Sequence, residues 1–75
     1  MNMTTDSSFY PHPLSSREKE VLALIAQGYT SKKIALLLNI DERTVASHRK
    51  SIRTKLQVKN VAGMIRHAIK MKLID

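Results

Sequence analysis

Hydrophobic residues recur at helical spacing in four segments of the chain, and short polar stretches separate these segments. The first segment begins at Ser15, whose hydroxyl can form a reciprocal capping box with Glu18, and it ends at Gly28. The second begins at Thr30, a favourable N-cap residue, and ends near Asn39. The pattern therefore predicts two helices, with these buried positions: Val21, Leu22, Leu24 and Ile25, then Ile34, Ala35, Leu37 and Leu38.

A third helix is predicted over about residues 42–56, with Asp41 as its capping residue. Val45, Ile52 and Leu56 lie on one line of this helix at about 100° per residue. Its opposite side is small, polar and cationic. Because only about three residues separate it from the helix before it, the two helices are expected to meet at a tight angle, as in helix-turn-helix units.

A fourth helix is predicted to begin after Asn60 and to run to about Met71. Its apolar residues cover close to half of its circumference, whereas packing on one core usually needs a stripe of about 100°. The excess predicts a second buried contact, such as a dimer partner. The alternative is that a small core uses more of this helix. Either way, the sequence predicts an all-α fold.

The first 13 residues are rich in Ser, Thr and Pro, and their few apolar residues have no period. We expect residues 1–13 to be a disordered tail or a linker, and residues 14–75 to form one domain. A chain of 75 residues buries only roughly 60% of the surface that its unfolded form exposes. Most enzymes need a larger scaffold.

Charge divides the chain into two unequal parts. The formal net charge is +7, and residues 43–75 contain nine basic residues against a single acidic one. Residues 1–42 contain four basic and five acidic residues. This asymmetry favours a polyanionic partner, either nucleic acid or an acidic membrane surface.

Residues able to support catalysis or metal binding are few. The chain has no cysteine, which excludes thiolate metal sites and is compatible with a reducing cytoplasm. Its histidines, His12, His48 and His67, stand singly, and two glycines are too few for a phosphate-binding loop. No apolar run approaches about 18 residues, so no membrane span is predicted. We expect no enzyme, no cofactor and no metal.

The predicted third helix suits the major groove of double-stranded DNA, which accepts one α-helix. Ser47 can donate to or accept from a base edge, and Lys50 can reach the acceptors of guanine. Phosphates are within reach of Arg43, Arg49, Arg53 and Thr54. The start of the second helix, with Ser31, Lys32 and Lys33, offers backbone N–H groups to a further phosphate.

Residues 14–22, Leu-Ser-Ser-Arg-Glu-Lys-Glu-Val-Leu, resemble the opening of the C-terminal DNA-binding domain of LuxR-type bacterial regulators. Further matches follow in register: Ile25-Ala26-Gln27-Gly28, Thr30 to Ala35, Leu38-Asn39-Ile40, Thr44-Val45, His48, Ile52, Lys55-Leu56 and Val58. The resemblance covers about residues 14–74. It implies a four-helix bundle with a helix-turn-helix over about residues 31–50, a recognition helix in the major groove and a dimer formed by the fourth helix.

The family's roles carry over to individual positions of this sequence. Ala46, Ser47 and Lys50 match base-reading positions, while Lys32 and Thr44 match positions near phosphates. His48 matches a family histidine at the core edge of the recognition helix, where it can touch the DNA backbone. The residues that lie on the pairing helix are Val61, Met64, Ile65 and Ala68.

Four positions depart from the family pattern. Lys33 stands where glutamate often completes a capping box, and Ala46 stands where a lysine is frequent, so the family's site preference cannot be borrowed. Gln57 replaces a common glycine, and this requires a left-handed or altered C-cap. Val61 replaces a frequent arginine.

Two other functions stay open at this point. The promoter-reading domain of bacterial sigma factors has a similar helix-turn-helix and would bind RNA polymerase. A helical protein-interaction module without DNA binding is the second alternative, and it would carry exposed apolar anchors on the third helix. The sequence favours the hypothesis of a DNA-binding regulator in the cytoplasm that acts as a homodimer, with RNA polymerase as a further candidate partner.

Overall fold

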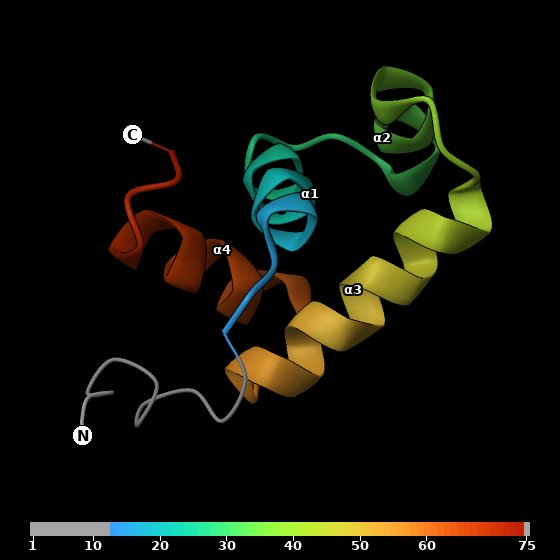
Figure 1. Cartoon of the computed structure of the whole chain (residues 1–75). Coiled ribbons are helices and arrows are strands. Elements are labelled where there is room, and N and C mark those ends of the chain that lie inside the picture. The colour runs from blue at the N-terminus through green and yellow to red at the C-terminus, as the bar shows by residue number, and fades with distance from the viewer. Residues whose placement is uncertain (1–12, 75) are drawn as a thin grey trace.

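The computed structural model describes residues 13–74, and all of their regular secondary structure is helical. The all-α fold class is therefore confirmed. Figure 1 shows the arrangement: α1 lies in the middle, α4 on one side, and α2 and α3 on the other. The four helices are α1 (Ser16–Ala26), α2 (Ser31–Leu38), α3 (Glu42–Leu56) and α4 (Val61–Lys70). Of the predicted tail at residues 1–13, residues 1–12 lie outside the described residues.

Polar side chains cap three of the four helices, as the sequence predicts. The Ser15 hydroxyl accepts from the Glu18 N–H at 3.1 Å, and the Glu18 carboxylate accepts from the Ser15 N–H at 2.8 Å. Thr30 accepts from the N–H of residue 33 at 3.2 Å, and Asn60 accepts from that of Gly63 at 3.0 Å. Each bond satisfies a backbone donor that the first helical turn leaves without a partner.

The connection between α2 and α3 is held by backbone groups. Asn39 adopts the left-handed conformation with φ of 56°, which ends α2, and the Ile40 N–H donates to the Ala35 carbonyl at 3.0 Å. Asp41 occupies the N-cap position of α3, but its side chain makes no capping hydrogen bond. The predicted cap is wrong in this respect, because the Asp41 carbonyl alone accepts from Thr44 and Val45.

The core receives apolar side chains from every helix. Its buried residues are Leu14, Val21, Leu22, Ile25, Ile34, Ala35, Val45, Ile52, Leu56, Met64 and Ala68. The line predicted along α3 is confirmed. The predicted inner face of α2 is partly wrong, because Leu37 is 50% exposed and Leu38 is only half-buried. Two adjacent residues, Ile34 and Ala35, fill the space that this short helix offers to the core.

Two backbone positions after α3 fix the placement of α4. Gln57 adopts the left-handed conformation with φ of 58°, as the sequence requires, and ends α3. In α4, a Cβ atom on Gly63 would lie 3.0 Å from Cβ of Val58, so α4 and the preceding segment approach closely where a side chain is missing. Among the described residues, no helix combines the length and apolar character needed to cross a membrane.

Candidate nucleic-acid interface

Helix α3 is amphipathic, and its polar side faces away from the rest of the domain. Val45, Ile52 and Leu56 are buried against the other helices. Figure 1 shows α3 along one margin of the molecule, with α1 next to the side of α3 that faces the middle of the domain. The exposed residues of the helix are Glu42, Arg43, Thr44, Ala46, Ser47, Lys50 and Thr54. This arrangement leaves one side of a 15-residue helix open to a partner.

The three residues predicted to read bases share one part of this open side. Ala46 and Lys50 are four residues apart, and Ser47 and Lys50 are three apart, so they are neighbours on the helix surface. All three are exposed. The short side chains of Ala46 and Ser47 allow a close approach of the backbone, while Lys50 extends beyond them as a flexible cation.

The residues predicted to contact phosphate surround this group at two levels of burial. Arg43 and Thr44 are exposed at the start of α3, whereas His48, Arg49 and Arg53 are half-buried along its flanks. Thr54 is exposed, but its hydroxyl donates to the carbonyl of residue 50 at 3.0 Å. That hydroxyl therefore has to leave the helix backbone before it can donate to a phosphate.

The start of α2 adds a further positive feature beside α3. Ser31 is half-buried there, and Lys32 and Lys33 are exposed. The first turn of α2 has no acidic residue, so the positive end of the helix dipole is not neutralised locally. A phosphate close to this turn would meet both the dipole and the lysine side chains.

Few carboxylates neutralise the cations of the domain. Within the part of the chain that the structure describes, the ion pairs are Arg17–Glu20 at 3.5 Å and Lys55–Glu18 at 2.8 Å. Neither involves a residue predicted to contact DNA. The same residues contain no group of three His, Asp or Glu side chains able to hold a metal ion.

Glu18 connects α1 to α3, and local sequence patterns gave no sign of this contact. Its carboxylate accepts from Lys55 Nζ at 2.8 Å and from Ser51 Oγ at 2.7 Å, in addition to its bond within the capping box. Burial on its own raises the pKa of the Glu18 carboxyl. Hydrogen bonds from Lys55, Ser15 and Ser51, together with the charge of Lys55, outweigh burial and lower that pKa to about 2. The capping box is visible in the sequence, but partners 33 and 37 residues away are not.

The residues predicted to form a dimer divide into two groups. Val61 is 39% exposed and Ile65 is half-buried, but Met64 and Ala68 are fully buried inside this chain. Those two contribute to the core, as the alternative of a small core using more of α4 expects. Ile69, which was not assigned to the interface, is 54% exposed. The apolar residues of α4 that stay at least partly open to solvent on this side are thus Val61, Ala62, Ile65 and Ile69.

The four helices, the short connection between α2 and α3, and the open cationic side of α3 define a helix-turn-helix domain. Residues 12–68 match the family of bacterial regulatory proteins described as the luxR family. The chain therefore belongs to the luxR family, as its resemblance predicts, and carries that family's DNA-binding helix-turn-helix domain.

Two relatives are regulatory proteins of staphylococci. Over 62 residues, or 83% of this chain, the identity is 45% with the oxygen regulatory protein NreC of Staphylococcus haemolyticus (strain JCSC1435). It is 44% over the same length with the oxygen regulatory protein NreC of Staphylococcus aureus (strain JH9). The chain spans 29% of the length of each of these relatives.

Proposed function

We propose that this domain binds double-stranded DNA at specific sequences as the output part of a bacterial transcription regulator, with α3 in the major groove. The observation that carries the proposal is the open side of α3, where Lys50 and Ser47 lie beside the small Ala46 and where no carboxylate of the described residues forms an ion pair with the surrounding cations. Such a regulator acts on DNA in the bacterial cytoplasm.

The dimensions of α3 suit this role. A helix with its side chains is about 10–12 Å across, and the major groove of B-DNA is about 12 Å wide. The 15 residues of α3 extend over about 22 Å, enough to follow the groove for several base pairs. In this position Lys50 reaches guanine O6 and N7, and Ser47 exchanges hydrogen bonds with a neighbouring base edge.

Phosphate contacts position the helix in the groove and supply most of the salt-dependent affinity. We propose that Arg43, Thr44, His48, Arg49, Arg53 and Thr54 contact the DNA backbone from α3, and that Ser31 and Lys32 contact it from the start of α2. Lys33 adds a positive charge there. These groups carry no base information, so their loss weakens binding to all sequences alike.

A homodimer on DNA completes the proposal. The exposed Val61 and Ile69 and the half-buried Ile65 of α4 support a two-fold contact, whereas Met64 and Ala68 are buried within the monomer. Ile69→Asp is expected to weaken binding to paired half-sites and to leave binding to an isolated half-site unchanged. Equal effects on both kinds of DNA would count against dimerisation through α4.

The test begins with selection of a preferred duplex from random DNA, followed by affinity measurements across salt concentrations. Each neutralised phosphate should steepen the log–log salt dependence by about 0.9. Lys50→Ala is expected to cost about 1–3 kcal/mol at one base position and to relax the preference there. Lys19→Ala removes an equal charge from the exposed side of α1 and serves as the control. Loss of affinity for every sequence alike in Lys50→Ala would make Lys50 a phosphate contact.

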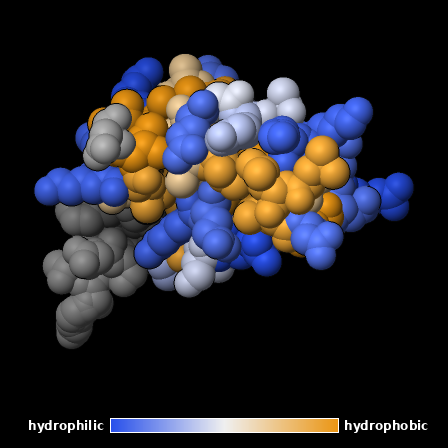
Figure 2. Space-filling view, turned by 90° about the horizontal axis from the view of Figure 1, so that it is seen from above, coloured by the Kyte–Doolittle hydropathy of each residue, from blue (hydrophilic) through white to orange (hydrophobic). Residues whose placement is uncertain are grey.

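A second candidate function is a contact with protein, favoured by one observation on α2. Leu36 is 70% exposed, and Leu37 and Tyr29 are also open to solvent. Figure 2 shows hydrophobic surface on the side of the molecule where α2 lies, bordered by hydrophilic side chains. RNA polymerase is the partner we propose. Leu36→Ser combined with Leu37→Ser should abolish co-purification with polymerase and leave DNA affinity intact; loss of both, or of neither, argues against this contact.

A further inference from the structure

We propose that Glu18 is a positioning residue for the recognition helix: from α1 it holds Ser51 and Lys55 and so sets the rotation of α3 about its own axis. The inference rests on the proposed DNA-binding function, since rotation of α3 decides which side chains face the groove. Glu18 itself does not contact DNA in this arrangement, because it lies on the inner side of the domain.

The Glu18 carboxylate is buried and uses both of its oxygens. Only 5% of the residue is exposed. Oε1 accepts from the Ser15 N–H and from Lys55 Nζ, each at 2.8 Å, and Oε2 accepts from Ser51 Oγ at 2.7 Å. Lys55 Nζ also donates to the Pro13 carbonyl at 3.4 Å. One carboxylate therefore joins the beginning of α1 to the second half of α3.

Capping of α1 does not account for this arrangement. The capping box needs the bond between the Glu18 side chain and the Ser15 N–H, and glutamine at the same position can also make it. The bonds to Ser51 and Lys55 add nothing to the cap. Both are contacts with a different helix, and Lys55 brings a full positive charge to a buried site that only a carboxylate neutralises.

Directional bonds are what the apolar packing of α3 lacks. Burial of Val45, Ile52 and Leu56 stabilises the packing of α3 on the core. It does not strongly favour one rotation of α3 about its axis, because burial of apolar surface has no direction. Charge-assisted hydrogen bonds are short and have a preferred geometry. Ser51 and Lys55 are four residues apart, so Glu18 holds α3 at two points about 6 Å apart along its axis.

These two anchors lie next to the residues that read DNA. Lys50 directly precedes Ser51, and Ser47 lies one helical turn before it. One residue of rotation corresponds to about 100°, so even a modest rotation of α3 turns Lys50 and Ser47 away from their base edges. Phosphate contacts made by long, flexible cations tolerate the same rotation more easily. Loss of the anchors should therefore reduce specificity more than general affinity.

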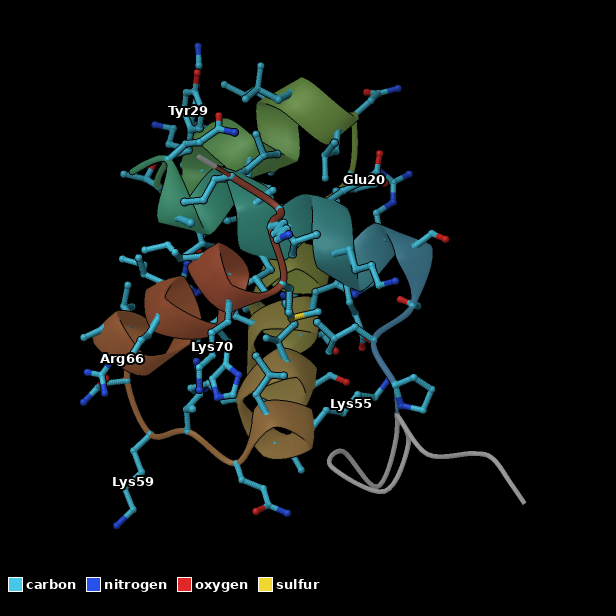
Figure 3. All side chains as sticks on the ribbon, turned by 90° about the vertical axis from the view of Figure 1, so that its left-hand side faces the viewer. Glu20, Tyr29, Lys55, Lys59, Arg66 and Lys70 are labelled. Atoms are coloured by element: carbon cyan, nitrogen blue, oxygen red, sulfur yellow. The ribbon has the colours of Figure 1, made fainter. Side chains whose placement is uncertain are left out.

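Glu18→Gln and Glu20→Gln make a matched pair of variants. Both remove one negative charge from α1, but Glu20 is exposed and pairs with Arg17 on the same helix. Figure 3 shows Lys55 extending from α3 toward the segment that leads into α1, whereas Glu20 points away from α3. Ser51→Ala is a milder third variant, because it removes one anchor and keeps the ion pair.

The first measurement is the ratio of the affinity for the selected duplex to the affinity for an unrelated duplex. It is made at one salt concentration and at a temperature where circular dichroism shows that each variant is folded. We expect Glu18→Gln to lower this ratio about tenfold, the loss of roughly one base contact, and Ser51→Ala to lower it about threefold. Glu20→Gln should leave it unchanged. An equal ratio in the folded Glu18→Gln and Glu20→Gln proteins would overturn the proposal.

The second measurement uses the free protein, so it does not depend on DNA binding. In nuclear magnetic resonance spectra, Glu18→Gln should shift the amide signals of residues 46–50, to which Glu18 makes no hydrogen bond, and leave those of α2 largely in place. Unchanged signals over residues 46–50 would overturn the proposal, even if the variant melts earlier. If the natural domain selects no preferred duplex, the proposed function fails, while these spectra still decide whether Glu18 positions α3.

Discussion

Glu18→Gln should destabilise the domain strongly at neutral pH and only slightly in acid. The pKa of the Glu18 carboxyl falls from its ordinary value of 4.5 to about 2 in the folded protein. Because the folded state binds this proton less readily than the unfolded state, ionised Glu18 contributes stability above about pH 5. That contribution decreases as the pH falls toward 2, where the carboxyl becomes protonated in the folded state as well.

The magnitude follows from the size of the pKa shift. A difference of roughly two and a half units corresponds to about 3 kcal/mol of unfolding free energy, at about 1.4 kcal/mol per unit. Small domains have total stabilities near the low end of about 5–15 kcal/mol, so this is a large share. Glu20→Gln removes an exposed ion pair of α1 and is expected to cost only about 0.2–0.5 kcal/mol.

Urea unfolding, followed by circular dichroism from about pH 7 down to about pH 2.5, measures the effect. The informative quantity is the difference between the natural protein and Glu18→Gln at each pH. His67 titrates in both proteins, with a pKa lowered by burial and by the charges of Lys70 and Arg66, so its contribution cancels in the difference. A difference that stays constant over this range would refute the assignment of a charged, stabilising Glu18.

Four further substitutions test the backbone and capping features of the domain, each by its unfolding free energy in urea. Gly63→Ala should destabilise although alanine favours helices, because its Cβ would lie 3.0 Å from that of Val58; in a Val58→Ala background it should become neutral or stabilising. Gln57→Gly should stabilise by about 1 kcal/mol, since φ at this position is 58°, and a destabilised variant would contradict this account. Thr30→Ala should cost about 1 kcal/mol and Asp41→Ala less, because only Thr30 accepts a capping bond; equal losses would count against that difference.

Features determined by neighbouring residues were predictable from the sequence. The capping box at Ser15 and the cap at Asn60 depend on side chains within four residues of each other, and the bounds of α3 follow from its apolar spacing. The buried line of α3 follows from spacing alone, since its apolar residues are few and lie on one side. The open, cationic side of the same helix follows with it.

Features that depend on tertiary contacts were not predictable in the same way. Residues 34–38 are all apolar, so their spacing cannot decide which of them face the core, and Leu37 was assigned wrongly. An apolar residue can pack either in the core or against a partner, so the sequence did not show that Met64 and Ala68 are buried within this chain. The bonds of Glu18 to Ser51 and Lys55 join positions more than 30 residues apart, and only the packing of α1 on α3 brings them together.

The ion pair between the buried Glu18 and the half-buried Lys55 responds to salt differently from the exposed cations of the domain. Mobile ions weaken attractions between exposed charges beyond about 8 Å at physiological ionic strength, but they reach a pair enclosed by protein far less. If the outer cations bind DNA phosphates as proposed, a rise in ionic strength should release the DNA while the Glu18–Lys55 pair persists. The free domain would then keep α3 in the orientation that it has on DNA, and rebinding at lower salt would need no rearrangement of that helix.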